Sequence, residues 1–284
     1  MRILLTGRGG QVGSALERAL APLGELSAFD RAGLDLLDLN SIRAKVEREK
    51  PDIIVNAAAY TAVDRAEGER EAVFAVNATA VRVLAEEAKT RDALLVHFST
   101  DYVFDGEKRS PYVETDATAP LSAYGWSKLE GERAVAASGC RHFIFRTSWV
   151  YAPAGRNFMR AILAAARSKP ELRVVDDQRG APTSSLAIAA AVAGILADPP
   201  LQKKPNGIYH MTAAGETTWY EFAKEILALN GLSTPLLPVS SAEYGAPVRR
   251  PRNSLLDNTK TVNTFGVVLD HWRVGLAAVM WSMH

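Results

Sequence analysis

Hydrophobic residues in the first half of the chain form short continuous runs, which alternate with longer segments where apolar residues recur every three to four positions. The short runs predict strands and the longer segments predict amphipathic helices. Parallel strands need helical crossovers, so the alternation predicts a parallel sheet covered on both faces. The expected strands span 3–6, 26–29, 53–56, 94–99 and 142–147, and the expected helices span 11–20, 41–49, 72–89 and 122–138.

After residue 147 the alternation becomes less regular, and Gly and Pro become more frequent. We therefore expect a Rossmann-type doubly wound α/β domain over 1–147, followed by a smaller, mainly substrate-binding region over 148–284. Helices in that C-terminal region are expected near 157–168, 186–196 and 220–229. A strand near 207–211 is expected to return to the sheet.

A glycine-rich loop, TGRGGQVG at 6–13, joins the first expected strand to the first helix. Glycines at this junction permit a tight turn and a close approach to a pyrophosphate, and the helix N-terminus offers free N–H groups. The position between strand and helix predicts a dinucleotide-binding loop. Its expected contacts are Gly7, Gly10, Gln11, Val12 and Gly13.

The choice between NAD and NADP rests on charged residues at the end of the second strand. Asp30 stands where an acidic group binds the ribose hydroxyls of NAD. Arg31 and Arg8 are cations that suit the 2′-phosphate of NADP. The residues point both ways; we favour NADPH, with NADH as the alternative. Asp35 and Leu36 are expected beside the adenine.

Tyr124 and Lys128 are four positions apart in an expected helix, so they share one face. A phenol with a pKa of about 10 is a poor acid at neutral pH, and a neighbouring ammonium lowers that pKa. Lys128 can also hold a nicotinamide ribose. Thr100 follows the fourth strand, where it can donate a hydrogen bond to a substrate carbonyl. These three residues are the predicted catalytic group.

Composition excludes several classes of protein. The 284 residues carry a net charge of +1, with 48% hydrophobic and 23% charged residues, which is typical of a globular protein. No Lys/Arg block is present, so a nucleic-acid partner is not expected. Cys140 is the single cysteine, the N-terminal apolar run is short, and the small-apolar stretch at 187–197 is too short for a membrane span. We expect a cytoplasmic protein without a membrane partner.

Several motifs resemble those of the extended short-chain dehydrogenase/reductase family, and more closely the family of dTDP-4-dehydrorhamnose reductases within it. The broader resemblance lies in the glycine loop, NAAA at 56–59, STDYVF at 99–104 and the Tyr124/Lys128 pair. The closer one lies in YTAVD at 60–64, RTSWVY at 146–151, DQRGAPT at 177–183 and RPRNS at 250–254. The motifs cover essentially the whole chain in order.

The resemblance implies reduction of the C4 keto group of dTDP-4-dehydro-β-L-rhamnose by NAD(P)H, giving dTDP-β-L-rhamnose. It implies that Tyr124 protonates the C4 oxygen, Lys128 binds the ribose and tunes Tyr124, and Thr100 holds the carbonyl. Asp101 and Trp149 match positions that contact the sugar. The matching cofactor positions also include Ala59, Tyr60 and Thr61.

The partner implied is a small nucleotide sugar. Its diphosphate is expected at a Pro-bounded cluster that includes Arg250 and Arg252, because guanidinium groups suit phosphates. Some relatives carry a glutamate that joins a magnesium-bridged dimer, whereas this chain has serine and alanine at 14–15 and two serines at 184–185. The histidines are scattered, so no metal is expected. We expect a monomer or a weak homodimer.

Two alternatives stay open. A non-catalytic regulatory subunit of the methionine adenosyltransferase type resembles the same family, although the motifs around Trp149 and at 177–183 favour the reductase. Another nucleotide-sugar reductase or an epimerase shares the tyrosine and lysine chemistry. Orientation of the sugar separates these enzymes, and this depends on the less regular C-terminal region.

Overall fold

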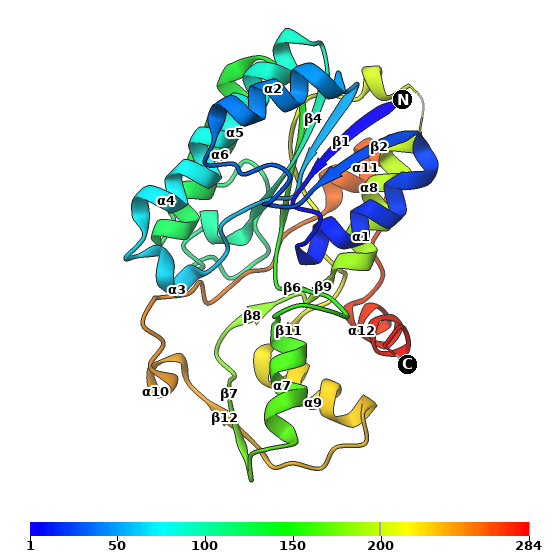
Figure 1. Cartoon of the computed structure of the whole chain (residues 1–284). Helices are drawn as coiled ribbons and strands as arrows, with labels where there is room; N and C mark the ends of the chain where they lie inside the picture. Colours follow the sequence, from blue (N-terminus) through cyan, green and yellow to red (C-terminus); the bar gives the residue numbers. More distant parts are fainter. Residues whose placement is uncertain (199, 284) are drawn as a thin grey trace.

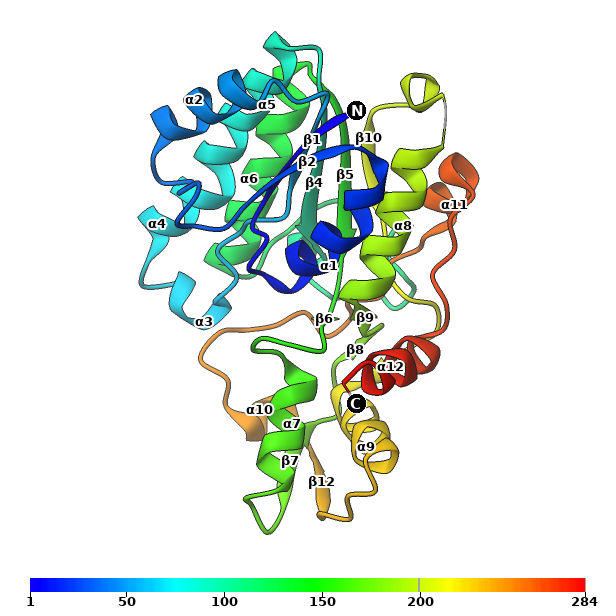
Figure 2. The same ribbon diagram turned by 45° about the vertical axis from the view of Figure 1, so that its right-hand side comes forward.

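A computed structural model describes residues 1–198 and 200–283. A six-stranded parallel sheet forms its centre (Figures 1 and 2). The strands are β1 (Arg2–Thr6), β2 (Glu25–Phe29), β3 (Ile53–Asn56), β4 (Leu94–Thr100), β5 (Arg141–Thr147) and β10 (Gly207–His210). They lie in the order β10-β5-β4-β3-β1-β2, and every neighbouring pair is parallel. The chain order reverses at β1 and β3, as in doubly wound sheets, so the predicted Rossmann-type α/β fold is confirmed.

Alternation along the strands divides the core into two layers, because successive side chains point to opposite faces of a sheet. Leu4 and Ile54 belong to one buried cluster, and Leu5 and Val55 belong to the other. The first face is covered by α2 (Leu39–Glu49), α5 (Ala80–Thr90) and α6 (Ala123–Ser138), with α4 (Arg70–Phe74) packed against α6; the second is covered by α1 (Gln11–Leu20), α8 (Ser185–Ala197) and α11 (Thr259–Phe265).

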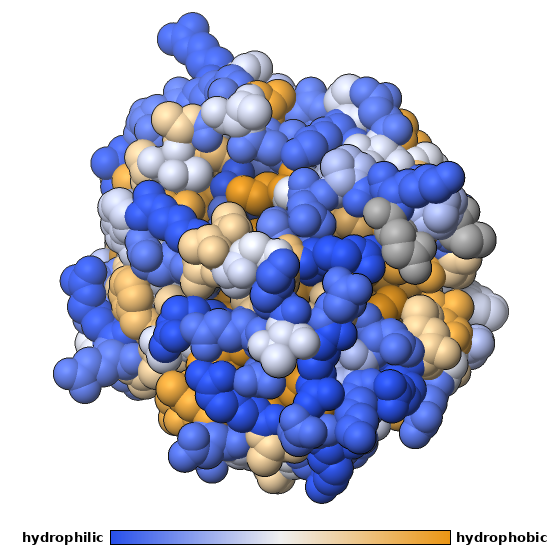
Figure 3. All heavy atoms as spheres, turned by 90° about the horizontal axis from the view of Figure 1, so that it is seen from above, coloured by the Kyte–Doolittle hydropathy of each residue, from blue (hydrophilic) through white to orange (hydrophobic). Residues whose placement is uncertain are grey.

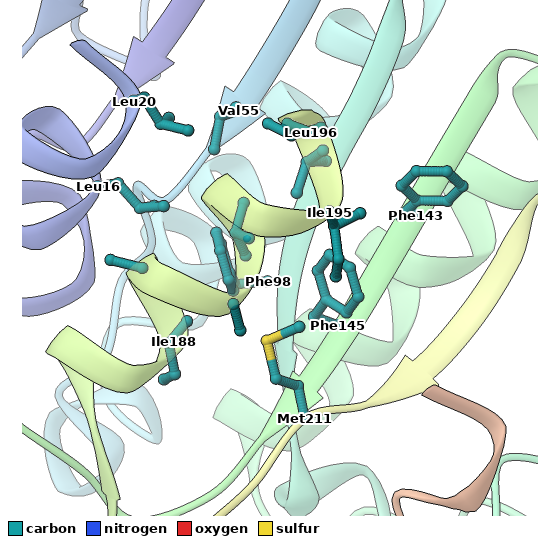
Figure 4. Packing of buried hydrophobic residues seen from close by; sticks show 14 of the residues in the cluster. Leu16, Leu20, Val55, Phe98, Phe143, Phe145, Ile188, Ile195, Leu196 and Met211 are labelled. Carbon is teal, nitrogen blue, oxygen red and sulfur yellow. The ribbon is translucent and has the colours of Figure 1, made fainter. Parts of the chain in front are cut away.

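α8 covers the sheet, although its place in the sequence put it in the C-terminal region. Its Ile188 and Ile195 point towards Phe98 and Phe145 of the sheet, and Leu16 of α1 lies alongside (Figure 4). The sequence of α8 is apolar almost all round, which is typical of a helix enclosed on several sides. After residue 147 the chain therefore returns to the sheet three times, through α8, β10 and α11.

The helix expected over 72–89 is a longer helical run with an internal π-helical turn. The π-turn, η2 (Ala75–Thr79), separates α4 from α5. Asn77 is buried within the turn, and its side chain accepts from Tyr60 N at 2.9 Å and donates to Tyr60 O at 3.0 Å. Such turns are frequent at functional sites, and this one fixes the segment that follows β3.

The C-terminal part of the molecule, drawn below the sheet in Figure 1, has its own small core of Met159, Phe222, Trp272 and Leu276 among others. Three pairs of very short strands frame it, which the sequence did not predict because each strand pairs with a distant one. Its elements are β6 (Val150–Tyr151) with β9 (Thr183–Ser184), β8 (Arg179–Gly180) with β11 (Thr217–Thr218), β7 (Leu172–Val175) with β12 (Leu236–Val239), and helices α7 (Phe158–Ala166), α9 (Trp219–Leu229), α10 (Ser241–Tyr244) and α12 (Trp272–Trp281).

Four short helices complete the chain: η1 (Ala21–Leu23), α3 (Val63–Ala66), η3 (Asp101–Val103) and η4 (Leu201–Lys203). The end of the molecule seen from above is covered mostly by hydrophilic residues, with small separate hydrophobic patches (Figure 3). Among the residues that the structure describes, no helix is both long and apolar enough to cross a membrane.

Candidate active site

A cavity of about 910 Å³ lies at the carboxyl ends of the sheet strands and extends to the C-terminal part of the molecule. Ligands of doubly wound folds bind at this edge, beside the strands where the chain order reverses. Every expected cofactor residue except Gly13 lines the cavity. These residues are Gly7, Gly10, Gln11, Val12, Asp30, Arg31, Asp35, Leu36, Ala59, Tyr60, Thr61, Tyr124 and Lys128.

The glycine loop is shaped by close backbone contacts. A Cβ on Gly7, which has φ +76°, would come within 2.6 Å of Ala58 N, and a Cβ on Gly13 would come within 1.9 Å of Gly7 O. Gly13 thus packs α1 against the loop instead of lining the cavity. Gly10, at the N-cap of α1, leaves the first amides of the helix uncapped. These open amides fit a dinucleotide pyrophosphate, because they can donate to its oxygens. Gln11 Oε1, buried without a partner among the described residues, is an acceptor and suits a ligand hydroxyl instead.

Charged groups gather at the end of the cavity that lies beside the carboxyl end of β2. Asp30 accepts a hydrogen bond from Gly33 N at 3.0 Å and lies 3.9 Å from Arg8 Nε. Arg31 Nε lies 3.3 Å from Asp35, and its side chain is 78% exposed. Exposed ion pairs contribute little stability, so these arginines are available to a phosphate. Asp30, which suits NAD, and Arg8 and Arg31, which suit NADP, therefore lie close together in the structure.

Tyr124 lies at the start of α6. Ser122 caps this helix by accepting from Gly125 N at 3.1 Å. A Cβ on Gly125 would come within 2.3 Å of Tyr102 O, so glycine lets the helix start approach η3 closely. The Tyr124 ring meets the Tyr102 ring edge to face, with centroids 5.5 Å apart. This contact places the phenol beside Thr100 and Asp101 in the cavity.

The pKa of Tyr124 differs from the expectation. Burial raises the pKa of its phenol well above the usual value, and a hydrogen bond with Thr100 opposes this only in part. Lys128 Nζ instead donates to Phe98 O at 2.5 Å, and burial lowers the pKa of Lys128 to about 8. The expectation that Lys128 lowers the pKa of Tyr124 is therefore wrong for this structure, because desolvation dominates both groups.

Thr100 and Asp101 form the floor of the cavity between Tyr124 and the C-terminal part. Thr100 Oγ1 donates to Asp101 Oδ1 at 3.0 Å, while Asp101 Oδ2 is buried without a partner among the described residues. Burial raises the pKa of Asp101 to about 6, although hydrogen bonds from Ser254 and Thr100 oppose the rise. A ligand hydroxyl would supply the hydrogen bond that this oxygen lacks.

Trp149 reaches the cavity in a strained backbone conformation with φ +49°. Its ring stacks on Trp219, with centroids 3.6 Å apart and planes 10° apart. Gly180 also lies against this ring, since a Cβ there would come within 2.4 Å of Cε2. The stack leaves the edge of Trp149, rather than an open ring face, for a ligand.

Arg250 and Arg252 do not line the cavity as the structure describes it, which differs from the expectation. Arg250 Nη2 lies 3.0 and 3.1 Å from the two carboxylate oxygens of Asp64, so it holds its segment against α3. The Arg252 side chain is exposed, and its backbone carbonyl accepts from Arg179 N at 2.8 Å. The cluster therefore docks the chain between the two parts of the molecule.

Sequence reasoning missed cavity residues that come from the C-terminal part, among them Gly155, Arg156 and Trp219. Gly155 lies beside Gln11, with a Cβ distance of 3.9 Å to Gln11 Cγ. Nothing local in the sequence marks these residues, because only tertiary contacts bring their segments to the cavity. Among the described residues, no group of three or more His, Cys, Asp and Glu is placed to hold a metal ion.

Comparison with known proteins agrees with this geometry. The family model described as RmlD substrate binding domain matches residues 1–284. The chain belongs to this family. It is 46% identical over 290 residues to a dTDP-4-dehydrorhamnose reductase from Burkholderia thailandensis, covering 97% of both chains, and 44% identical over 294 residues to one from Escherichia coli, covering 99% of this chain and 97% of the relative.

A solved structure extends the likeness to the fold. The dTDP-4-dehydrorhamnose reductase from Bacillus anthracis, in complex with NADP, superposes with a TM-score of 0.93 at 34% identity and covers 99% of both chains. The family and the full-length match therefore agree with the motifs in the sequence.

Proposed function

We propose that this chain is an oxidoreductase that reduces the C4 keto group of dTDP-4-dehydro-β-L-rhamnose to give dTDP-β-L-rhamnose, the activated sugar of dTDP-rhamnose biosynthesis. One observation carries the proposal: Tyr124 and Thr100 stand side by side where the cavity of the glycine loop meets the aromatic pair Trp149 and Trp219. Full-length relatives at 46% and 44% identity are named for this reaction.

The cofactor is NADPH, with NADH as the alternative, and when bound it supplies the hydride. The amides at the start of α1, that of Gln11 among them, hold its pyrophosphate, and Asp30 with Arg31 holds the adenosine end. Lys128 holds the nicotinamide ribose through a donor not engaged by Phe98 O. Support comes from the match to a reductase solved with NADP.

Tyr124 is the proton donor to the C4 oxygen. Its raised pKa keeps the phenol protonated at neutral pH, and reduction of a ketone requires a proton at the oxygen while hydride adds to the carbon. Thr100 donates to the same oxygen once its hydroxyl turns from Asp101 Oδ1 to the substrate. The protonated phenol is the form that can donate to the C4 oxygen, although the rise in its pKa, contrary to the sequence-based expectation, makes it a weaker acid.

The division of labour between residues 1–147 and 148–284 is part of the proposal. We assign sugar recognition to Asp101, whose free Oδ2 accepts from a hydroxyl, and to the edge of Trp149. The C-terminal part then decides which sugar fits, while the sheet carries the cofactor and the acid. α8, β10 and α11 are exceptions, since they belong to the sheet layer.

The chain is further proposed to be a monomer or a weak homodimer, because it lacks acidic residues at 14–15 and 184–185 that could hold a bridging magnesium ion. Light scattering during size exclusion, with magnesium or with a chelator, tests this. A dimer that forms only with magnesium would contradict it. The proposed place of the protein is the cytoplasm, which suits a chain with a single cysteine.

The decisive test is a spectrophotometric assay of dTDP-4-dehydro-L-rhamnose with NADPH and NADH in parallel, followed by NMR of the product. Oxidation of NADPH and the L-rhamno configuration at C4 are expected. The opposite configuration would indicate another nucleotide-sugar reductase or an epimerase. No turnover, together with tight binding to a methionine adenosyltransferase, would favour the regulatory-subunit alternative.

A further inference from the structure

A row of buried polar side chains in contact with one another crosses three adjacent strands behind the cavity and ends at Lys128. Thr6, Asn56 and His97 come from β1, β3 and β4, and none is more than 1% exposed. Asn56 Oδ1 lies 2.6 Å from Thr6 Oγ1, and Asn56 Nδ2 lies 3.1 Å from His97 Nδ1. His97 Nε2 then lies 3.4 Å from Lys128 Nζ. The roles proposed above use only the lysine.

His97 is neutral in this environment. Burial lowers the pKa of its imidazole well below the usual value, and the charge of Lys128 lowers it further. A neutral imidazole carries one N–H and one acceptor nitrogen. The group that faces Nδ1 therefore decides whether Nε2 donates to Lys128 or accepts from it.

The atom of the Asn56 amide that faces His97 decides whether His97 Nε2 donates to Lys128 or accepts from it. With Nδ2 towards His97, the imidazole proton sits on Nε2 and faces the Lys128 ammonium, so two donors oppose each other. Oxygen and nitrogen of an amide have nearly the same shape, so a half-turn exchanges them in place. Thr6 Oγ1, which donates to Oδ1 in the orientation described, then accepts from Nδ2. Asn56 Oδ1 then accepts from Nδ1–H, and Nε2 accepts from Lys128.

We propose that His97 is a positioning residue for Lys128: with Nδ1–H held by Asn56, its Nε2 accepts a hydrogen bond from the Lys128 ammonium. An ammonium has three donors. Phe98 O takes one at 2.5 Å and His97 takes a second, which leaves the third for the cavity that Lys128 lines. The ammonium is thus aimed at the cofactor ribose before any ligand binds.

The packing of α6 supports a fixed position. Gly131 follows Lys128 by nearly one turn, and a Cβ there would lie 3.7 Å from His97 Nε2 and 2.3 Å from Asn77 O. Glycine therefore lets the helix approach β4 and the π-turn closely. His97 cannot turn away from Lys128, because α6 and the sheet enclose it.

The other charged groups near Lys128 act on its pKa too. Glu132, on the same helix, raises it, and Glu132 is itself held by Arg146 of β5 through bonds of 2.8 and 2.6 Å. Tyr124 and Asp101 are the other titratable groups at this end of the cavity. Loss of the His97 acceptor leaves all four in place, so a change in pH dependence reports on His97.

The test compares His97→Phe, which removes the acceptor, with His97→Gln, whose amide oxygen reaches the place of Nε2, and His97→Asn, which reaches only that of Nδ1. Two quantities are measured against pH: the dissociation constant for NADPH from its fluorescence, and kcat/KM for NADPH. His142→Phe is the matched control, since His142 Nδ1 contacts only Cys140 O, at 2.9 Å, among the described residues.

Removing an acceptor destabilises the ammonium and lowers the pKa of Lys128. The alkaline loss of activity should therefore begin at a lower pH than in the wild type. We expect His97→Phe and His97→Asn to move the alkaline limb down by about one pH unit and to weaken NADPH binding about tenfold more at pH 8.5 than at pH 6.5. His97→Gln should restore the wild-type limb, and His142→Phe should leave it unmoved.

A uniform loss at every pH with an unmoved limb would overturn the proposal, as would identical limbs for His97→Gln and His97→Asn. If His97→Phe does not fold, the comparison of the two amide variants decides. The inference rests on the proposed function only for the NADPH site. Failure of the enzyme to reduce the sugar would contradict the proposed reductase function. The pH dependence of NADPH binding would still test the role of His97.

Discussion

The two walls of the cavity are built in different ways. The wall at the sheet edge carries Tyr124, Lys128 and Thr100, which are held by strand ends, a capped helix and buried hydrogen bonds. The wall in the C-terminal part carries Trp149 and Trp219, which meet through very short strands and a ring stack. The hydrogen-bonded wall at the sheet edge suits proton and hydride transfer, which need a defined geometry. The other wall suits selection of the sugar.

The largest effect is expected at the sheet wall. Tyr124→Phe removes the proton donor and should lower kcat by about 10²- to 10⁴-fold, with little change in the dissociation constant for NADPH. Stopped-flow turnover and NADPH fluorescence measure the two. Tyr102→Phe is the control, because its ring packs against Tyr124 at 5.5 Å. A larger loss in the control would show that the acid is misassigned.

The next largest effect is expected from a substitution in the glycine loop. A Cβ at Gly13 would come within 1.9 Å of Gly7 O, whereas at Gly9 it would find only Asp30 Cβ at 3.8 Å. Overpacking of this kind destabilises by about 1–3 kcal/mol or more, so Gly13→Ala should weaken NADPH binding by about tenfold or more. Gly9→Ala should bind normally in the same titration. Equal binding by both would mean that the loop relaxes freely.

A smaller and different effect is expected at the C-terminal wall. Trp219→Leu removes the partner of Trp149, and aromatic pairs contribute about 0.5–1.5 kcal/mol, so KM for the nucleotide sugar should rise up to about tenfold. The dissociation constant for NADPH should stay within about twofold. Trp281→Leu is the control, as that side chain is 83% exposed. A change in NADPH binding instead of KM would show that the two walls are not separate.

The smallest effect is expected at the contact that joins the walls. The Arg250–Asp64 pair is partly exposed, and such pairs contribute about 0–1 kcal/mol. Arg250→Ala and Asp64→Asn should each lower the free energy of unfolding in urea by that amount, with a coupling seen in the double variant and no change in KM. A rise in KM for Arg250→Ala alone would return this arginine to the substrate diphosphate.

The two walls also differ in how well the sequence predicts them. The glycine loop, the Tyr124/Lys128 pair and Thr100 occupy places that follow from local rules, namely a strand, a turn and a helix period. Trp219 gives no local signal, since a lone tryptophan at a helix start is common in cores. The sequence of α8, by contrast, gives a clear signal: its apolar residues predict that the helix is buried. They do not indicate that it packs against the sheet, so its placement was missed.

By itself, the sequence determined the strands and helices of the first half, the cofactor loop and the spacing of Tyr124 and Lys128, because these depend on residues close in the chain. The order of the strands in the sheet joins segments that are far apart, such as β1 and β3. Only the tertiary structure decided the pKa values of the site. Burial raises the pKa of Tyr124 and lowers that of Lys128, and His97 meets Lys128 across 31 positions. Desolvation depends on every segment that packs around a group, and no local pattern in the chain records that.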